Sequence, residues 1–450
     1  MIIPDLAIKA AEAVDRAGGR LLLVGGQVRD YLLMPENETA SEAGAEGFQD
    51  FDLTLFGLSF DLAMKHLQPL GELQPVGRRT LSDREKELSL LHLRRAENIL
   101  EISLPRRLDD SGQPEFAAGA SVAEDAATRD FTINAIYLDP LTRDLTDPLA
   151  GRSDLAEGRL RLAGPGSLAA DPLRLLRAMG LIARFRLQPD DELLGAARRQ
   201  APGLSRVPGD RLWPEWRKWA LSPFPHLGLI FLAESGLREF WPELSGLAAA
   251  SSEFGGELWT HTVKVAEILA SQALPPECSR LVLTLAALLQ RLNASKGPAG
   301  DAPVRPSSAE AFLANLKAPA LVITAVGKLV EARLKYSGFT PAAIRRLARR
   351  LAPELTPLDF YYLAKCDFEA GGGQQRFPLS PSDFLAPLAG RNAGPAPLLS
   401  GRDILAAFPQ LRPGPEVGRL LKLVMDAADE GTVKTKQEAL NLTVKFFKAE

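Results

Sequence analysis

The chain has 450 residues, 46% of them hydrophobic and 24% charged, with a net charge of −3 and an isoelectric point near 6.0. This length exceeds a single ordinary core and predicts two to four packed units. The near-neutral charge excludes a general polyanion-binding surface, so any nucleic acid must be held by local basic stripes.

Residue usage also limits the compartment and the metal chemistry. Two cysteines and four histidines rule out a disulfide framework and a histidine-rich metal centre. No apolar run reaches the roughly 20 residues of a membrane helix, and acidic residues interrupt the apolar pattern at the N-terminus. These features favour a cytoplasmic protein with no membrane partner.

The hydrophobic pattern predicts mixed strands and helices up to about residue 150, then helices. Helices are expected at 5–17, 61–67, 211–221 and 227–235, and strands at 20–24, 52–56, 88–93, 99–104 and 135–138. Segments rich in Gly, Pro and Ala at 297–308 and 377–399 are expected to be linkers or loops. The polar segments 36–47 and 104–112 are expected to be mobile.

A glycine-basic turn follows the first predicted strand, in Val24-Gly25-Gly26-Gln27-Val28-Arg29-Asp30. Glycine lets the backbone approach a ligand closely, and the N–H groups of the next helix favour an anion. Arg29 is placed to reach the same phosphate with forked donors. The alternative is a structural turn with a surface arginine.

Asp50 and Asp52 flank Phe51, so on a strand both carboxylates lie on one face. Such a pair of hard oxygen ligands suits Mg²⁺, which binds one or two carboxylates together with substrate phosphates. The alternative is a polar strand edge or a loop cap. Directly after a strand–Gly-Gly–helix unit, the metal interpretation is favoured.

These motifs continue in a fixed order over residues 20–220. The later ones are Arg129-Asp130-Phe131-Thr132-Ile133-Asn134-Ala135, Asp147-Pro148…Gly151-Arg152, Asp171-Pro172-Leu173-Arg174-Leu175-Leu176-Arg177-Ala178 and Asp210-Arg211…Glu215. The order resembles the class II tRNA nucleotidyltransferase and bacterial poly(A) polymerase family, of the DNA polymerase β-like superfamily. The resemblance implies an α+β fold: a polymerase β-like head with a small mixed sheet, then an all-α neck, body and tail.

The resemblance divides the chain into a nucleotidyltransferase head (1–155), a helical neck that recognises the base (156–250) and a helical RNA-binding body and tail (251–450). It also implies the site residues. Catalytic Mg²⁺ would lie on Asp50 and Asp52, with Glu101 as a candidate third carboxylate, and the nucleotide would contact Gly25, Gly26, Arg29 and Arg129.

Base selection is expected from Asp171, Arg174 and Arg177, whose spacing of three places them on one face of a helix. An ionised carboxylate only accepts hydrogen bonds and a guanidinium only donates them, a combination that suits cytosine and adenine. Uracil or guanine would leave buried groups unpaired. The alternative is a set of ordinary surface ion pairs.

Three positions depart from the family pattern. Ala170 stands where an acid is frequent, Thr128 where an arginine is frequent, and Gly180 where many members have a further arginine. Gly180 removes a possible base or phosphate contact, so the departures concern the choice of CTP and ATP rather than catalysis.

The C-terminal half shows two further patterns. Residues 257–262 resemble the start of the HD-type domain of some relatives, but no His-Asp pair follows near 289–292, so His261 is expected to be structural and no phosphohydrolase activity is expected. A basic stripe suits an RNA backbone or, alternatively, a solvated helix face. It comprises Arg345, Arg346, Arg349 and Arg350.

The leading hypothesis is a template-independent nucleotidyltransferase that adds C, A or both from CTP and ATP to tRNA 3′ ends, with Mg²⁺ and release of pyrophosphate. A bacterial poly(A) polymerase is the alternative, and a nucleotide-binding regulator without catalysis is the third reading. DNA is not expected as a partner. The residues leave open how much of CCA is added.

Overall fold

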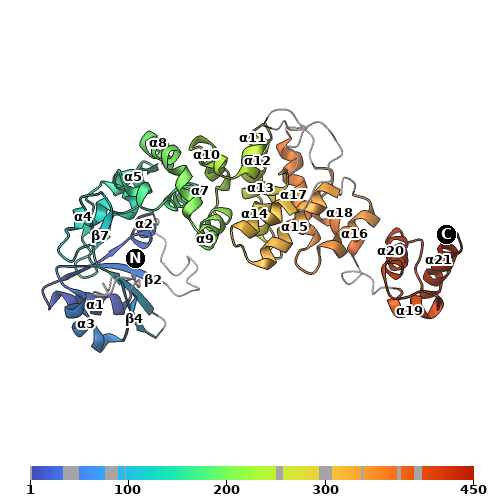
Figure 1. Cartoon of the computed structure of the whole chain (residues 1–450), viewed down its shortest axis with the longest axis horizontal. Helices are drawn as coiled ribbons and strands as arrows, with labels where there is room; N and C mark the ends of the chain where they lie inside the picture. The colour runs from blue at the N-terminus through green and yellow to red at the C-terminus, as the bar shows by residue number, and fades with distance from the viewer. Residues whose placement is uncertain are drawn as a thin grey trace. The chain divides into compact units, whose positions relative to one another are not determined.

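The structure is a computed structural model. It describes residues 3–33, 50–76, 90–96, 98–249, 257–292, 307–335, 339–371, 377–389 and 398–449. The chain divides into two compact units, Met1–Val207 with Phe231–Leu237 and Pro208–Ile230 with Arg238–Glu450. Among the described residues every strand lies in the first unit and the second is helical, which confirms the predicted α+β fold (Figure 1). The finer division at residues 155 and 250 stays a prediction.

A seven-stranded mixed sheet forms the centre of the first unit, in the order β3-β4-β5-β2-β1-β8-β9. Its strands are β1 (Arg20–Val24), β2 (Asp50–Phe56), β3 (Glu72–Val76), β4 (Leu90–Arg95), β5 (Asn98–Ser103), β8 (Tyr137–Leu138) and β9 (Leu145–Thr146). The pair β2–β5 is parallel and the other neighbours are antiparallel. All five strands predicted from the sequence are present; β1 has the predicted ends and the other four have shifted ends.

The register of the sheet places three polar residues in one row. Asp52 of β2 lies opposite Glu101 of β5, which lies opposite His92 of β4. Directly opposite residues project to the same face. Because Leu53 and Leu55 alternate with Asp52, they face the other way and are buried.

Small side chains let the first helix pack closely on the sheet. Helix α1 (Asp5–Asp15) contacts β1 and α3 (Phe60–Leu67), and its buried face includes Ala7, Ala10 and Ala11. Ser59 begins α3 by accepting a hydrogen bond from the Leu62 N–H. Both helices agree with the sequence prediction.

The first unit contains a small hairpin, a short parallel pair and further helices. The hairpin pairs β6 (Arg106–Leu108) with β7 (Pro114–Phe116), and the parallel pair joins β10 (Arg159–Leu160) to β11 (Gln188–Pro189). The helices are α2 (Gly26–Leu33), α4 (Val122–Ala127), α5 (Gly151–Ala156), α6 (Ser167–Ala170), α7 (Arg174–Phe185) and α8 (Asp191–Gln200). The hairpin corrects the expectation of a mobile segment at 104–112.

The second unit is built from helices. They are α9 (Gly209–Ala220), most of α10 (Pro225–Glu234), α11 (Pro242–Ala249), α12 (Leu258–Ala270), α13 (Arg280–Leu289), α14 (Ser307–Asn315), α15 (Ala320–Lys335), α16 (Pro341–Leu351), α17 (Pro357–Ala370), α18 (Pro381–Leu385), α19 (Gly401–Ala407), α20 (Pro415–Glu430) and α21 (Lys436–Ala449). Trp216, Trp241 and Phe312 pack edge to face within it. Helices α19–α21 enclose a separate apolar cluster that includes Ile404 and Leu420.

Some expectations fall outside the described residues. They include the segment 36–47, residues 297–306 of the first expected linker and residues 390–397 of the second. Within the second expected linker, residues 381–385 form α18. No helix in the described part of the chain is long and apolar enough to cross a membrane.

Candidate active site

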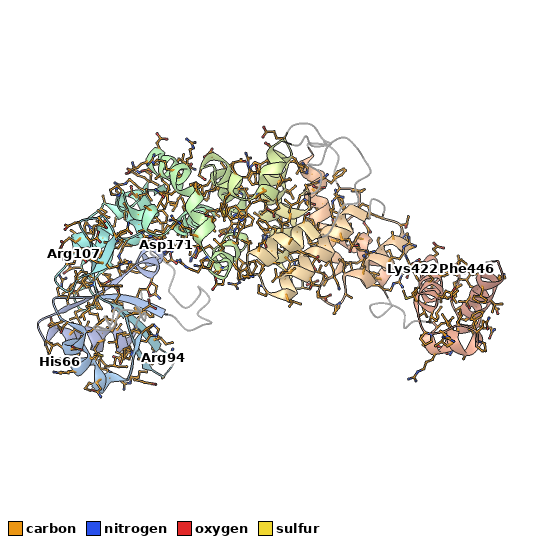
Figure 2. The ribbon with its side chains drawn as sticks, viewed as in Figure 1. His66, Arg94, Arg107, Asp171, Lys422 and Phe446 are labelled. Atoms are coloured by element: carbon orange, nitrogen blue, oxygen red, sulfur yellow. The ribbon has the colours of Figure 1, made fainter. Side chains whose placement is uncertain are left out.

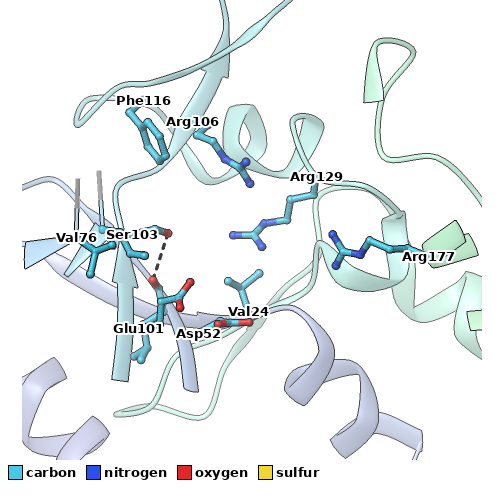
Figure 3. Close-up of a pocket in the computed structure, with 11 residues that line it drawn as sticks. Val24, Asp52, Val76, Glu101, Ser103, Arg106, Phe116, Arg129 and Arg177 are labelled. Atoms are coloured by element: carbon cyan, nitrogen blue, oxygen red, sulfur yellow. Dashed lines mark hydrogen bonds between the residues drawn. The ribbon is translucent and has the colours of Figure 1, made fainter. Parts of the chain in front are cut away.

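A cavity of about 610 Å³ opens in the first unit beside Asp52. It is lined by Val24, Asp52, Leu53, Val76, Leu90, Glu101, Ser103, Arg106, Phe116, Arg129 and Arg177. Asp52 and Glu101 lie on one side, and three guanidinium groups point toward the space from the other (Figure 3). The cavity therefore joins a carboxylate wall to an arginine wall.

The carboxylate wall is formed by adjacent strands of the sheet. Asp52 is exposed, and Glu101, directly opposite it in register, has an Oε2 3.4 Å from His92 Nε2. Asp50 lies on the same strand two residues earlier, but its side chain is outside the described part of the structure. Within the described residues no group of three His, Cys, Asp or Glu side chains could hold a metal ion. The further carboxylate expected from the sequence is Asp50, which lies two residues before Asp52 on β2.

Arg129 is held firmly at the edge of the cavity. Its guanidinium donates to the Asp125 carboxylate at 2.9 Å, to the Tyr137 hydroxyl at 3.0 Å and to the Thr54 hydroxyl at 3.0 Å. Burial acts against its charge, but Tyr137 and Asp125 outweigh burial and raise the pKa of Arg129 above its usual value. It is therefore a fixed positive charge facing the carboxylates.

Arg177 reaches the cavity from α7. Its Nη2 lies 3.0 Å from Oδ2 of the buried Asp130. Burial would raise the pKa of Asp130, yet the charges of Arg177 and Arg174 hold it below the usual range. Asp130 also accepts a hydrogen bond from the Asn134 amide at 3.1 Å.

The sequence analysis did not predict several residues of this site, among them Arg106, Phe116 and Asp125. Arg106 lines the cavity from β6, in a segment expected to be mobile. The buried Asp125 links β6 to Arg129, because its Oδ1 accepts a hydrogen bond from the Arg106 backbone N–H at 2.8 Å and its Oδ2 accepts one from the Arg129 guanidinium. The spacing of four between Asp125 and Arg129 was a usable signal for an ion pair.

The glycine turn borders the carboxylates, but Arg29 does not line the cavity. Gly25 has a φ of +91°, a conformation that favours glycine, and a Cβ built on it would lie 3.5 Å from Asp52 Oδ2. Arg29 is buried, where it pairs with Asp30, donates to Asn134 Oδ1 at 2.6 Å and stacks over Phe185. Burial lowers the pKa of Arg29. Nη2 of its guanidinium lies 3.3 Å from a Cβ built on Gly26, so Arg29 packs against the glycine turn from the protein side.

The prediction that Asp171, Arg174 and Arg177 share a helix was wrong for Asp171. Helix α7 begins at Arg174, and Asp171 lies in the preceding turn, where its carboxylate accepts from the Leu173 N–H at 3.2 Å (Figure 2). Short acidic side chains bind nearby backbone N–H groups in this way and so favour positions before a helix. Arg174 is buried and donates to the carbonyls of Thr128, Arg129 and Ser167.

The departures from the family pattern have different surroundings. Thr128 is buried, and its hydroxyl donates to the Asp125 carbonyl at 2.8 Å. A Cβ built on Gly180 would meet nothing within 4 Å. Ala170 is the last residue of α6. Thr128 is therefore part of the packed support of the site, whereas position 180 is open.

In the second unit, His261 is a structural residue, as predicted. Its Nε2 lies 2.9 Å from the buried Asp367, which also accepts from Gln290 at 3.2 Å and pairs with Arg291 at 2.9 Å and with Arg333. Gln290 and Arg291 occupy the stretch in which the HD comparison would place a metal dyad. Guanidinium groups therefore balance the charge of this carboxylate.

The basic stripe on α16 has acidic partners within the same unit. Arg345 donates to the Asp429 carbonyl at 2.9 Å, and Arg349 pairs with the Asp429 carboxylate. Arg346 lies 3.7 Å from Glu430, and Arg350 pairs with Glu331 on α15. The stripe therefore carries less uncompensated charge than its sequence suggests, and its RNA-binding role stays a prediction.

Comparisons with known proteins agree with this fold. The Poly A polymerase head domain family matches residues 21–161. An A-adding tRNA nucleotidyltransferase of Deinococcus radiodurans is 31% identical over 347 residues, which cover 71% of this chain and 78% of that protein. A CC-adding tRNA nucleotidyltransferase of Synechocystis is 25% identical over 423 residues, covering 93% and 91%. The structure of the Bacillus stearothermophilus CCA-adding enzyme in complex with CTP aligns with a TM-score of 0.64 at 19% identity, over 99% of both chains.

The fold, the carboxylate-arginine cavity and these relatives define the protein as a nucleotidyltransferase. The chain belongs to the class II tRNA nucleotidyltransferase and bacterial poly(A) polymerase family.

Proposed function

We propose that this protein adds C, A or both from CTP and ATP to the 3′ ends of tRNA. Three relatives that cover 71%, 93% and 71% of the chain are named tRNA nucleotidyltransferases, which favours tRNA as the substrate over the poly(A) polymerase alternative. The observation that carries the proposal is the cavity in which Asp52 and Glu101 face three arginines. The expected location in the cytoplasm stays a prediction.

The residues present fit Mg²⁺ as the cofactor. Asp52 offers an exposed carboxylate at the cavity, Asp50 lies on the same strand, and Glu101 lies opposite Asp52 in register. Hard oxygen ligands of this kind are typical of magnesium sites that also bind substrate phosphates. When bound, the metal would activate the RNA 3′-hydroxyl and offset charge on the leaving pyrophosphate.

The arginine wall would hold the incoming nucleotide. Arg129, fixed by Asp125 and Tyr137, provides a rigid positive charge for the triphosphate, and Arg177 adds a second. Gly25 would allow the backbone to approach the phosphates. Arg29 and Arg174 would act indirectly, since both are buried and bonded to neighbouring protein groups. For Asp171 we keep the proposed role in base selection, from the turn before α7.

The test is incorporation of each labelled NTP into tRNA that ends at the discriminator base, at C or at CC. Incorporation of C or A at a defined step is expected, and Asp52→Asn should abolish it while the protein stays folded. Long A-tails on unstructured RNA would support a poly(A) polymerase instead. No incorporation with any NTP would contradict both activities.

A further inference from the structure

The hairpin β6–β7 presents an arginine and an aromatic ring side by side to the cavity. Arg106 and Phe116 are directly opposite each other in register, and both line the cavity. Figure 3 shows the Phe116 ring and the Arg106 guanidinium on the same side of this space. The backbone of the hairpin is anchored, because the Arg106 N–H donates to the buried Asp125.

Among the three cavity arginines, Arg106 has the least compensated charge. Arg129 pairs with Asp125 and Arg177 with Asp130, whereas no described carboxylate forms an ion pair with the Arg106 guanidinium. Burial, and then repulsion from Arg129, lower the pKa of Arg106. A half-buried guanidinium in this position is stabilised by an anionic ligand, and a phosphate is the anion that a nucleotidyltransferase supplies.

Phe116 adds a different kind of contact. The residue is 40% exposed and lines the cavity. Aromatic rings in this setting bind nucleic acid bases by stacking, and every base has a face that can stack. Such a contact suits a ligand whose base changes from one step to the next. The 3′ end of a growing RNA is that kind of ligand, because each addition replaces its terminal base.

We propose that Arg106 and Phe116 bind the 3′-terminal nucleotide of the RNA, with its phosphate on Arg106 and its base stacked on Phe116. The inference rests on the proposed function. It assigns the hairpin to the RNA and leaves the triphosphate to Arg129 and Arg177. Two substrates then occupy one cavity, and the RNA end lies close to the carboxylates.

The test is steady-state kinetics of the full-length protein with Arg106→Ala and Phe116→Ala. Each variant should raise the KM for RNA about 5- to 150-fold, the range of a lost base stack or phosphate contact, with the KM for NTP unchanged. Arg107→Ala is the matched control, because Arg107 is the next residue on β6, is exposed and pairs with Glu115 outside the cavity (Figure 2). It should leave both KM values unchanged. Phe116→Trp should retain RNA binding.

Modified RNA substrates distinguish a lost contact with the 3′-terminal nucleotide from a general loss of activity. On RNA whose 3′-terminal residue lacks its base, Phe116→Ala should have little further effect. On RNA with a neutral methylphosphonate before that residue, Arg106→Ala should have little further effect. An increase in the KM for NTP alone, equal effects of Arg107→Ala, or an undiminished Phe116→Ala effect on the abasic RNA would overturn the inference. In each of these outcomes the unmodified protein is active; failure of the proposed function would instead appear as an inactive wild type.

Discussion

Replacing Asp125 with asparagine should both destabilise the first unit and weaken nucleotide binding. The buried Asp125 carboxylate accepts hydrogen bonds from the Arg106 N–H, from two nitrogens of Arg129 and from the Tyr137 hydroxyl. Asparagine keeps the shape but removes the charge. With its oxygen facing Arg106, its amide would place a donor against the donors of Arg129.

The expected loss of stability follows from the burial of the Asp125–Arg129 ion pair. Leaving one member of a buried ion pair without its partner costs about 3 to 5 kcal/mol. For a unit of this size, that loss lowers the unfolding temperature by roughly 6 to 20 °C. Arg129 would also lose its fixed position at the cavity, and displacement of a substrate-binding group reduces kcat/KM by about 10- to 100-fold.

Asp154→Asn is the matched control. Asp154 is equally buried and pairs with Arg159 and Arg161 in the same unit, but it does not line the cavity. Thermal unfolding by circular dichroism and the KM for NTP should be measured for both variants. Both should unfold at lower temperature, and only Asp125→Asn should raise the KM. An Asp125→Asn protein with wild-type stability and wild-type KM would refute the reasoning.

Three further outcomes are expected. Gly25→Ala should lower the rate of nucleotide incorporation, because a positive φ strains alanine and the new methyl group adjoins Asp52. Gly18→Ala is the control: Gly18 also has a positive φ, of +85°, but its surroundings are open, so this variant should keep the wild-type rate. Burial alone would raise the pKa of Asp367, but His261 and two arginines hold this pKa below its usual range. The ionised Asp367 carboxylate therefore stabilises the fold above about pH 4, and this stabilisation is lost at lower pH. Asp367→Asn should therefore reduce the free energy of unfolding in urea by about 3 kcal/mol at pH 7 and by less at pH 3. Burial, and then Asp359, raise the pKa of Cys278 to about 12, so iodoacetamide at pH 8 should label it far more slowly than free cysteine, as mass spectrometry would show.

The sheet and its carboxylate row could be predicted from the sequence because strand alternation fixes faces locally. The strand β1 was predicted from its apolar run before the glycine turn, and the shared face of Asp50 and Asp52 from their spacing of two. The β5 segment with Glu101 was predicted as a further strand. Pairing of β2 with β5 then brings Glu101 beside Asp52. The roles of these residues in catalysis stay predictions.

The sequence could not show which arginines face the cavity and which are buried, because this depends on tertiary contacts. Arg174 looks like an exposed helix residue in sequence, yet burial directs it to backbone carbonyls. Arg106 and Phe116 belong to three-residue strands in a polar segment, which leaves too short a pattern for any periodicity. Asp171 was misplaced because the helix was extended through a turn that its own side chain stabilises.

The buried carboxylate of Asp367 also limits where the chain can be truncated. Its partners come from the end of α13 and from α12 and α15, while Asp367 itself lies on α17. A fragment that begins or ends between residues 262 and 366 would separate this buried anion from at least one of its donors. Such truncations should give insoluble products, so fragment boundaries belong outside this interval. One buried carboxylate thereby ties α12, α13, α15 and α17 together.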